Sequence, residues 1–124
     1  MQNRIISIDP GNEESAFCVM NFDDYSLVRF GKVPNQELLE LLYRIGEDGT
    51  FTAGTKEMAI EMVASYGMPV GASIFETVFW IGRFWEAAPG LQRTKVYRSD
   101  VKLNLCNSKK AKDSNVCQAL IDRF

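Results

Sequence analysis

The chain has 124 residues, of which 46% are hydrophobic and 24% charged, and this size and composition fit one folded domain rather than two. It contains no histidine, which excludes a serine–histidine–aspartate triad and a histidine-ligated zinc site, and its three scattered cysteines are too few for a disulfide framework. The net charge is −2, and the sequence shows neither a membrane-length apolar run nor the start of a secretion signal, so we expect a cytoplasmic protein.

Three strands are predicted first. Arg4–Ile8 is rich in isoleucine, as strands often are, and a turn at Pro10–Asn12 follows it. Ser15–Phe22 and Ser26–Val33 predict two further strands, joined by a hairpin turn at Asp23–Asp24.

A helix is predicted next, from Asn35, which could cap it, to about Ile45. Its buried side would carry four leucines: Leu38, Leu39, Leu41 and Leu42. A polar, glycine-rich stretch then leads to a compact apolar strand, Met58–Val63. A long helix is predicted at Ala72–Ala87, where apolar residues recur at helical spacing: Ile74, Val78, Ile81 and Trp85.

The end of the chain predicts a short strand at Lys95–Arg98 and a helix from Ser114, with Asp113 as its cap. The order of elements predicts an α/β domain over residues 1–124, with a mixed five-stranded sheet and helices on both faces. Three antiparallel strands would come first, followed by β-α-β-α. The final helix has no stop signal before Phe124, so we expect the natural protein to continue.

Asp9 ends the first predicted strand and precedes Pro10 and Gly11. A carboxylate at a strand end, beside a glycine that leaves room for a phosphate, is a good position for a metal ligand. Asp-Pro-Gly is also a common turn sequence in which the aspartate starts an Asx turn. Taken alone, Asp9 favours the turn interpretation.

Glu61 interrupts the apolar strand Met58–Val63. An acid in a buried strand is unfavourable unless it is paired or metal-bound, whereas on an edge strand it could face water. The apolar residues cover both faces of this strand, which favours a buried strand and a functional Glu61. Two acids on adjacent strands can hold magnesium or manganese for phosphodiester hydrolysis without any histidine.

Charge divides the chain into two parts. Up to Gln92 there are six Lys/Arg and thirteen Asp/Glu, and from Arg93 onward there are eight and three. A basic end of this kind indicates contact with a polyanion, or alternatively a solvated loop and helix. Five aromatic residues within Ala72–Ala87 fit core or dimer packing better than base stacking: Phe75, Phe79, Trp80, Phe84 and Trp85.

Three blocks of this sequence together resemble the RuvC-type Holliday junction resolvases. Ile5–Gly11 is similar to the family's opening strand, and Ala59–Glu61, with the glycines at 67, 71 and 82, resembles its second acidic strand and the helix after it. Tyr97–Lys102 and Ala111–Val116 resemble a third block, which contains a lysine-bearing strand and a loop that enters a helix. The blocks follow the family's order and cover most of the chain.

This resemblance implies a ribonuclease-H-like fold, magnesium-dependent cleavage of branched DNA, and a homodimer on four-way junctions. It implies that Asp9 and Glu61 are metal ligands and that Lys102 is a catalytic basic residue near the scissile phosphate, although Lys102 alone would predict only an exposed lysine. The expected DNA-binding residues are Arg98, Lys102, Lys109, Lys110, Lys112 and Tyr66.

Two departures from the family pattern concern the metal ligands and the recognition of the junction. The family supplies further acids from a helix downstream of the last block, and this chain ends before such a helix. Asp113 here fits a helix cap better than a ligand. Ala64 stands where the family tends to place a stacking aromatic, with Tyr66 nearby. Phage-type relatives with broader branched-DNA substrates therefore resemble this chain more.

Two other functions remain open from the sequence. A nucleotide-binding fragment of the actin and sugar-kinase fold also begins with a strand that ends in Asp-x-Gly, but nothing here resembles its second phosphate loop. A non-catalytic relative that binds branched DNA is the other alternative.

Overall fold

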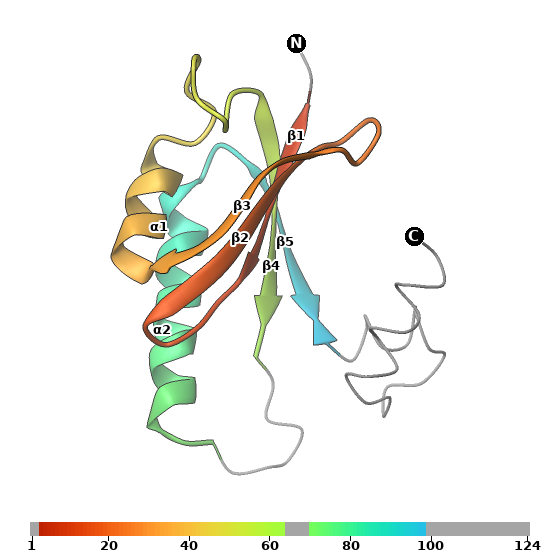
Figure 1. The fold of residues 1–124 in the computed structure, drawn as a ribbon. Coiled ribbons are helices and arrows are strands. Elements are labelled where there is room, and N and C mark those ends of the chain that lie inside the picture. Colours follow the sequence, from red (N-terminus) through yellow and green to blue (C-terminus); the bar gives the residue numbers. More distant parts are fainter. Residues whose placement is uncertain (1–2, 64–69, 99–124) are drawn as a thin grey trace, which may run out of the picture.

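The computed structural model describes residues 3–63 and 70–98 (Figure 1). Seven elements follow one another along the chain: β1 (Arg4–Asp9), β2 (Glu14–Asn21), β3 (Leu27–Pro34), α1 (Asn35–Tyr43), β4 (Thr55–Met62), α2 (Ala72–Ala87) and β5 (Gln92–Tyr97). The strands form one five-stranded sheet in the order β3-β2-β1-β4-β5. β1 pairs antiparallel with β2 and parallel with β4, and β4 pairs parallel with β5. The predicted mixed sheet is confirmed.

Both described helices lie on the same face of the sheet (Figure 1). They enclose a core formed by alternate residues of the inner strands and one side of each helix, including Ile6, Ile8, Val19, Leu38, Leu39, Leu42, Met58, Ile60, Ile81 and Phe84. The helix predicted from Ser114 lies outside the described residues. Neither α1 nor α2 is long and apolar enough to cross a membrane.

The start of α1 corrects one prediction. Pro34 occupies the N-cap position, and no side chain caps the helix there. Asn35 is the first helical residue, and its side-chain amide instead donates a hydrogen bond to the carbonyl of Gly11, at 2.9 Å. The predicted cap is therefore wrong, because a distant loop uses the polar group that a local pattern assigned to the helix end.

Two strands, β4 and β5, begin three residues earlier than predicted. β4 begins at Thr55 rather than Met58, and Thr55 and Glu57 pair with the first residues of β1. β5 covers Gln92–Tyr97 rather than Lys95–Arg98. In both cases backbone pairing in the sheet extends the strand through polar residues that hydrophobicity alone does not mark.

α2 has the predicted bounds, but its buried side differs from the expected one. Thr77, Ile81, Phe84 and Ala87 are buried. Val78, predicted on the apolar stripe, is 39% exposed, and Phe75 and Phe79 are more exposed still. Of the five aromatic residues of α2, only Phe84 is fully buried in the core, whereas Phe75 and Phe79 face solvent.

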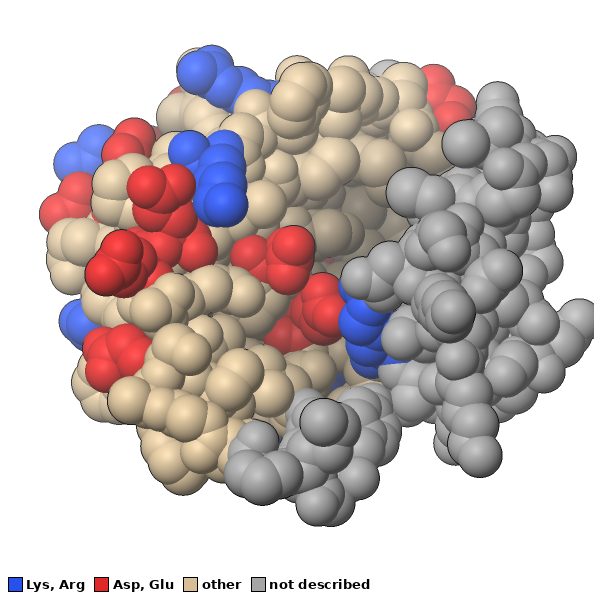
Figure 2. All heavy atoms as spheres, turned by 60° about the horizontal axis from the view of Figure 1, so that its bottom comes forward, with Lys and Arg blue, Asp and Glu red and all other residues tan. Residues whose placement is uncertain are grey.

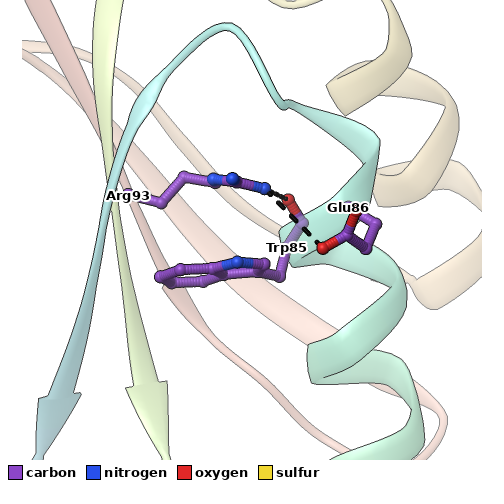
Figure 3. Close-up of polar contacts among 3 residues, drawn as sticks. All are labelled: Trp85, Glu86 and Arg93. Carbon is purple, nitrogen blue, oxygen red and sulfur yellow. Dashed lines mark hydrogen bonds and ion pairs between the residues drawn. The ribbon is translucent and has the colours of Figure 1, made fainter.

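Arg93 fastens β5 to the end of α2 (Figure 3). Its Nη1 donates to the backbone carbonyl of Trp85 at 2.7 Å and lies 3.9 Å from the carboxylate of Glu86. The guanidinium carbon is 4.9 Å from the centroid of the Trp85 ring, and Lys95 Nζ is 5.2 Å from the same centroid. Two cations of the basic part of the chain thus have structural roles.

The orientation of α2 can be tested with two alanine variants. Phe84→Ala should lower the free energy of unfolding by about 3–5 kcal/mol, because it leaves a cavity in the core. Phe75→Ala, at a position that is 64% exposed, should change it by about 0.5 kcal/mol or less. Denaturant unfolding at low protein concentration measures both, and equal losses would contradict this orientation.

Candidate functional site

Asp9 and Glu61 lie at the carboxyl ends of adjacent parallel strands. In the β1–β4 register Ile8 pairs with Ile60, so the next residue on each strand is one of the two acids. Parallel neighbours lie about 4.8 Å apart across a sheet. Their carboxylates are thus placed side by side, as the sequence predicted for two acids on adjacent central strands.

Both acids point away from the helix-covered core. Ile8 and Ile60 are buried in that core, and successive side chains of a strand alternate between its faces. Asp9 is exposed, and the side chain of Glu61 is 33% exposed. Because β4 lies between β1 and β5, the alternative that Glu61 faces water from an edge strand is wrong.

The Asx-turn alternative does not describe Asp9. Asp24 plays that role in the β2–β3 hairpin, where its Oδ1 accepts hydrogen bonds from the hydroxyl of Ser26 at 2.7 Å and from its N–H at 2.9 Å. These bonds lower the pKa of Asp24. Within residues 3–63 and 70–98, Asp9 has no such bond, which leaves its carboxylate available to a ligand.

Arg98 brings a positive charge to the same end of the sheet. Val96 pairs with Glu61 across β4 and β5, and Arg98 follows two residues later. Its Nη1 lies 3.8 Å from Oε1 of Glu61, in a pair whose side chains are 43% and 33% exposed. At that exposure the pair contributes little to stability, so its importance lies in placing a cation beside the acids.

A buried polar network holds the turn that follows Asp9. The N–H of Gly11 donates to Ser15 Oγ at 3.1 Å, and Ser15 Oγ donates to Asn35 Oδ1 at 2.6 Å. Asn35 Nδ2 in turn donates to the Gly11 carbonyl at 2.9 Å. A Cβ at Gly11 would collide with the backbone carbonyl of Glu14, so only glycine fits this turn. The role of Ser15 has no local signal in the sequence, and the local pattern at Asn35 predicts a helix cap instead.

Acidic side chains gather at this end of the molecule, and a basic side chain lies close to them (Figure 2). Glu13, in the β1–β2 connection, and Glu14, the first residue of β2, are exposed acids in addition to the two site acids. Such a surface repels a phosphate backbone unless cations intervene. The local charge therefore fits a site that binds cations first.

Oxygen donors of this kind fit magnesium or manganese. Among the described residues no cluster of three or more potential ligands is found, so Asp9 and Glu61 by themselves would supply only part of the coordination sphere of an ion. Magnesium commonly retains several waters and needs only one or two protein carboxylates. The donor chemistry thus fits the ion that the resemblance implies.

Cys18 lies on the same face of the sheet as Asp9, because it pairs with Ser7 on β1. Burial raises the pKa of its thiol. A raised pKa reduces the thiolate population at neutral pH and makes Cys18 a poor nucleophile. Thiol chemistry is thereby disfavoured at this position.

The other predicted site residues lie outside the described residues. These are Tyr66, Lys102, Lys109, Lys110 and Lys112, together with the predicted helix cap Asp113. Of the predicted site, the structure brings together Asp9, Glu61 and Arg98.

Comparison with known proteins gives a structural likeness only. No protein-family model and no curated protein sequence matches the chain. A structure of Thermus thermophilus RuvC superposes with a TM-score of 0.67 and 17% identity, over 96% of this chain and 78% of that one. T. thermophilus RuvC in complex with a Holliday junction substrate gives 0.66 and 18%, over 97% and 78%. The chain therefore has the ribonuclease-H-like fold of these neighbours.

Metal binding at the strand ends is directly testable. Asp9→Asn and Glu61→Gln should each weaken Mn²⁺ binding by about tenfold or more, because each removes a charged oxygen ligand. Glu57→Gln is the matched control, since Glu57 lies on the same face of β4 near its other end. Calorimetric titration measures the affinities, and equal affinities in all four proteins would rule out this site.

Proposed function

We propose that the chain is a magnesium-dependent endonuclease that cleaves phosphodiesters in branched DNA, with manganese as an alternative ion. The observation that carries this proposal is the register of β1 and β4, which puts Asp9 and Glu61 side by side. The fold shared with T. thermophilus RuvC supports it, since one RuvC structure holds a Holliday junction substrate.

Each site residue has a proposed role. Asp9 and Glu61 would hold the ion, and a bound magnesium ion would supply an activated water and neutralise charge on the phosphate. Lys102 is proposed as a catalytic basic residue near the scissile phosphate. That role rests on the resemblance, because Lys102 lies outside the described residues.

DNA would be held mainly through its phosphates. Arg98 lies at the border of the acidic site, where its guanidinium could contact both Glu61 and a phosphate oxygen. The other proposed contacts are Lys102, Lys109, Lys110, Lys112 and Tyr66. Contacts to phosphates fix the position of DNA without reading its sequence, which suits a nuclease that recognises a branch.

The proposed substrate range is broad. Ala64 stands where the resembled family tends to have a stacking aromatic, so recognition would depend less on stacking at a four-way junction. Phage-type relatives with broad branched-DNA substrates are therefore the closer parallel. A cytoplasmic location gives such an enzyme access to its DNA.

A homodimer is part of the proposal. Phe75, Val78 and Phe79 are exposed and lie on the side of α2 opposite its buried residues. Gly82 continues this stripe one turn later and has open space around it. An apolar stripe facing solvent is typical of an interface, and a second copy would bring two metal sites to one junction.

Cleavage of a labelled four-way junction in magnesium tests the activity. The parent protein should cut the junction, whereas Asp9→Asn should reduce cutting by about a thousandfold or more because the ion loses a ligand. Equal cutting by parent and variant would show that Asp9 is not in the site.

A binding measurement without magnesium separates the alternatives. Arg98→Gln should weaken junction binding and reduce its dependence on salt, because one phosphate contact is lost. Junction binding without magnesium, together with no cutting by the parent after magnesium is added, would favour the non-catalytic relative. Tight ATP binding without junction binding would favour the actin-like nucleotide-binding fragment.

The proposed dimer face can be tested separately. Phe79→Glu should shift the protein from dimer to monomer, because it puts a charge into an apolar contact. Phe30→Glu makes the same change at an exposed aromatic on β3 and should leave the dimer intact. Sedimentation velocity measures both, and an unchanged mass for Phe79→Glu would argue against this face.

A further inference from the structure

The network around Gly11 satisfies both backbone polar groups of one turn residue with buried side chains. Ser15 is 1% exposed and Asn35 is 2% exposed. Ser15 Oγ accepts from the Gly11 N–H at 3.1 Å, and Asn35 Nδ2 donates to the Gly11 carbonyl at 2.9 Å. The Ser15–Asn35 bond of 2.6 Å closes the ring. Three segments, the turn, β2 and α1, are thereby tied together at one residue.

Asn35 also binds the turn through its backbone. Its N–H donates to the carbonyl of Glu13 at 2.9 Å. The first residue of α1 thus donates hydrogen bonds to the backbone carbonyls of both Gly11 and Glu13 in the β1–β2 connection. Such a satisfied, buried network restricts the loop to one conformation more strictly than apolar packing would.

The constraint reaches Asp9 through a short and stiff connection. Pro10 alone separates Asp9 from Gly11, and its ring fixes the backbone φ angle near −65°. Gly11 lies so close to the backbone carbonyl of Glu14 that a Cβ there would collide with it. On the other side, Asp9 is fixed by its pairing with Ala16 in the β1–β2 ladder.

We propose that Ser15 and Asn35 are positioning residues for the Asp9 carboxylate, and that they set the metal affinity of the Asp9–Glu61 pair. The inference rests on the proposed function only in requiring that this pair binds a divalent ion. Ligand positions must be held to within a few tenths of an ångström, and residues that orient metal ligands typically contribute about 10–100-fold in affinity.

The chain offers a matched control at the other end of the sheet. Thr52 is also buried, and its Oγ1 accepts a hydrogen bond from the N–H of Gly46 at 3.2 Å. Thr52→Val removes that hydroxyl just as Ser15→Ala removes the other. Both variants lose a buried hydroxyl that accepts from a glycine N–H, but only Ser15 lies next to the site.

The experiment follows Mn²⁺ binding through paramagnetic broadening of the Asp9 and Gly11 amide signals, well below the unfolding temperature. Both variants should lower the midpoint of thermal unfolding by several degrees. Ser15→Ala should raise the Mn²⁺ concentration for half-maximal broadening by about tenfold. Thr52→Val should leave that concentration within about twofold of the parent value, because its lost bond does not reach Asp9.

A second variant keeps the test valid if Ser15→Ala fails to fold. Asn35→Asp conserves the volume and the acceptor for Ser15, but it replaces the amide group that donates to Gly11. It should weaken Mn²⁺ binding in the same way.

Three results would overturn the inference. Parent-like Mn²⁺ binding by the folded Ser15→Ala or Asn35→Asp protein would do so, and so would an equal loss in Thr52→Val, which would indicate a general effect of instability. Parent protein that binds Mn²⁺ no better than Asp9→Asn would overturn the proposed metal site itself, and the positioning role with it.

Discussion

The parallel pairing of β1 with β4 is the constraint on which both the core and the site depend. Ile8 and Ile60 pair in register and are buried against the helices. Because side chains alternate along a strand, this register places the following acids together on the opposite face. A shift of one residue in either strand would turn its acid toward the core and an isoleucine toward solvent. Hydrophobic burial therefore specifies where the carboxylates meet.

Carboxylates held side by side repel one another, and the fold accommodates them by its electrostatics. They lie at the end of the sheet, away from the apolar core, and Arg98 contributes a positive charge 3.8 Å from Glu61. A divalent ion would relieve the repulsion more fully, because it binds both groups at once. The same excess of negative charge that disfavours bare DNA would then favour the ion that allows a phosphate to approach.

The sequence predicts features that depend on residues close together in the chain. The apolar run of β1, the helical spacing of α2 and the acid that interrupts β4 are features of this kind. Features that depend on distant partners have no such local signal. The local pattern predicts a cap at Asn35, whose bond to Gly11 spans 24 residues, and it does not mark Thr55 as part of β4, because the strand character of Thr55 comes from pairing with Arg4. Packing against the sheet also determines which apolar residues of α2 are buried, since the sheet lies against Phe84 rather than Val78.

Charge patterning illustrates the same limit. The basic part of the chain predicts a polyanion contact, yet Arg93 stacks on Trp85 and donates to its carbonyl, and Lys95 lies over the same ring. Arg98 pairs with Glu61. All three described cations of that part therefore have partners within the domain, so the count of basic residues overstates the charge available to DNA. In the proposed nuclease, affinity for DNA would then depend strongly on the divalent ion, and the geometry of the Asp9 turn would influence substrate binding as well as cleavage.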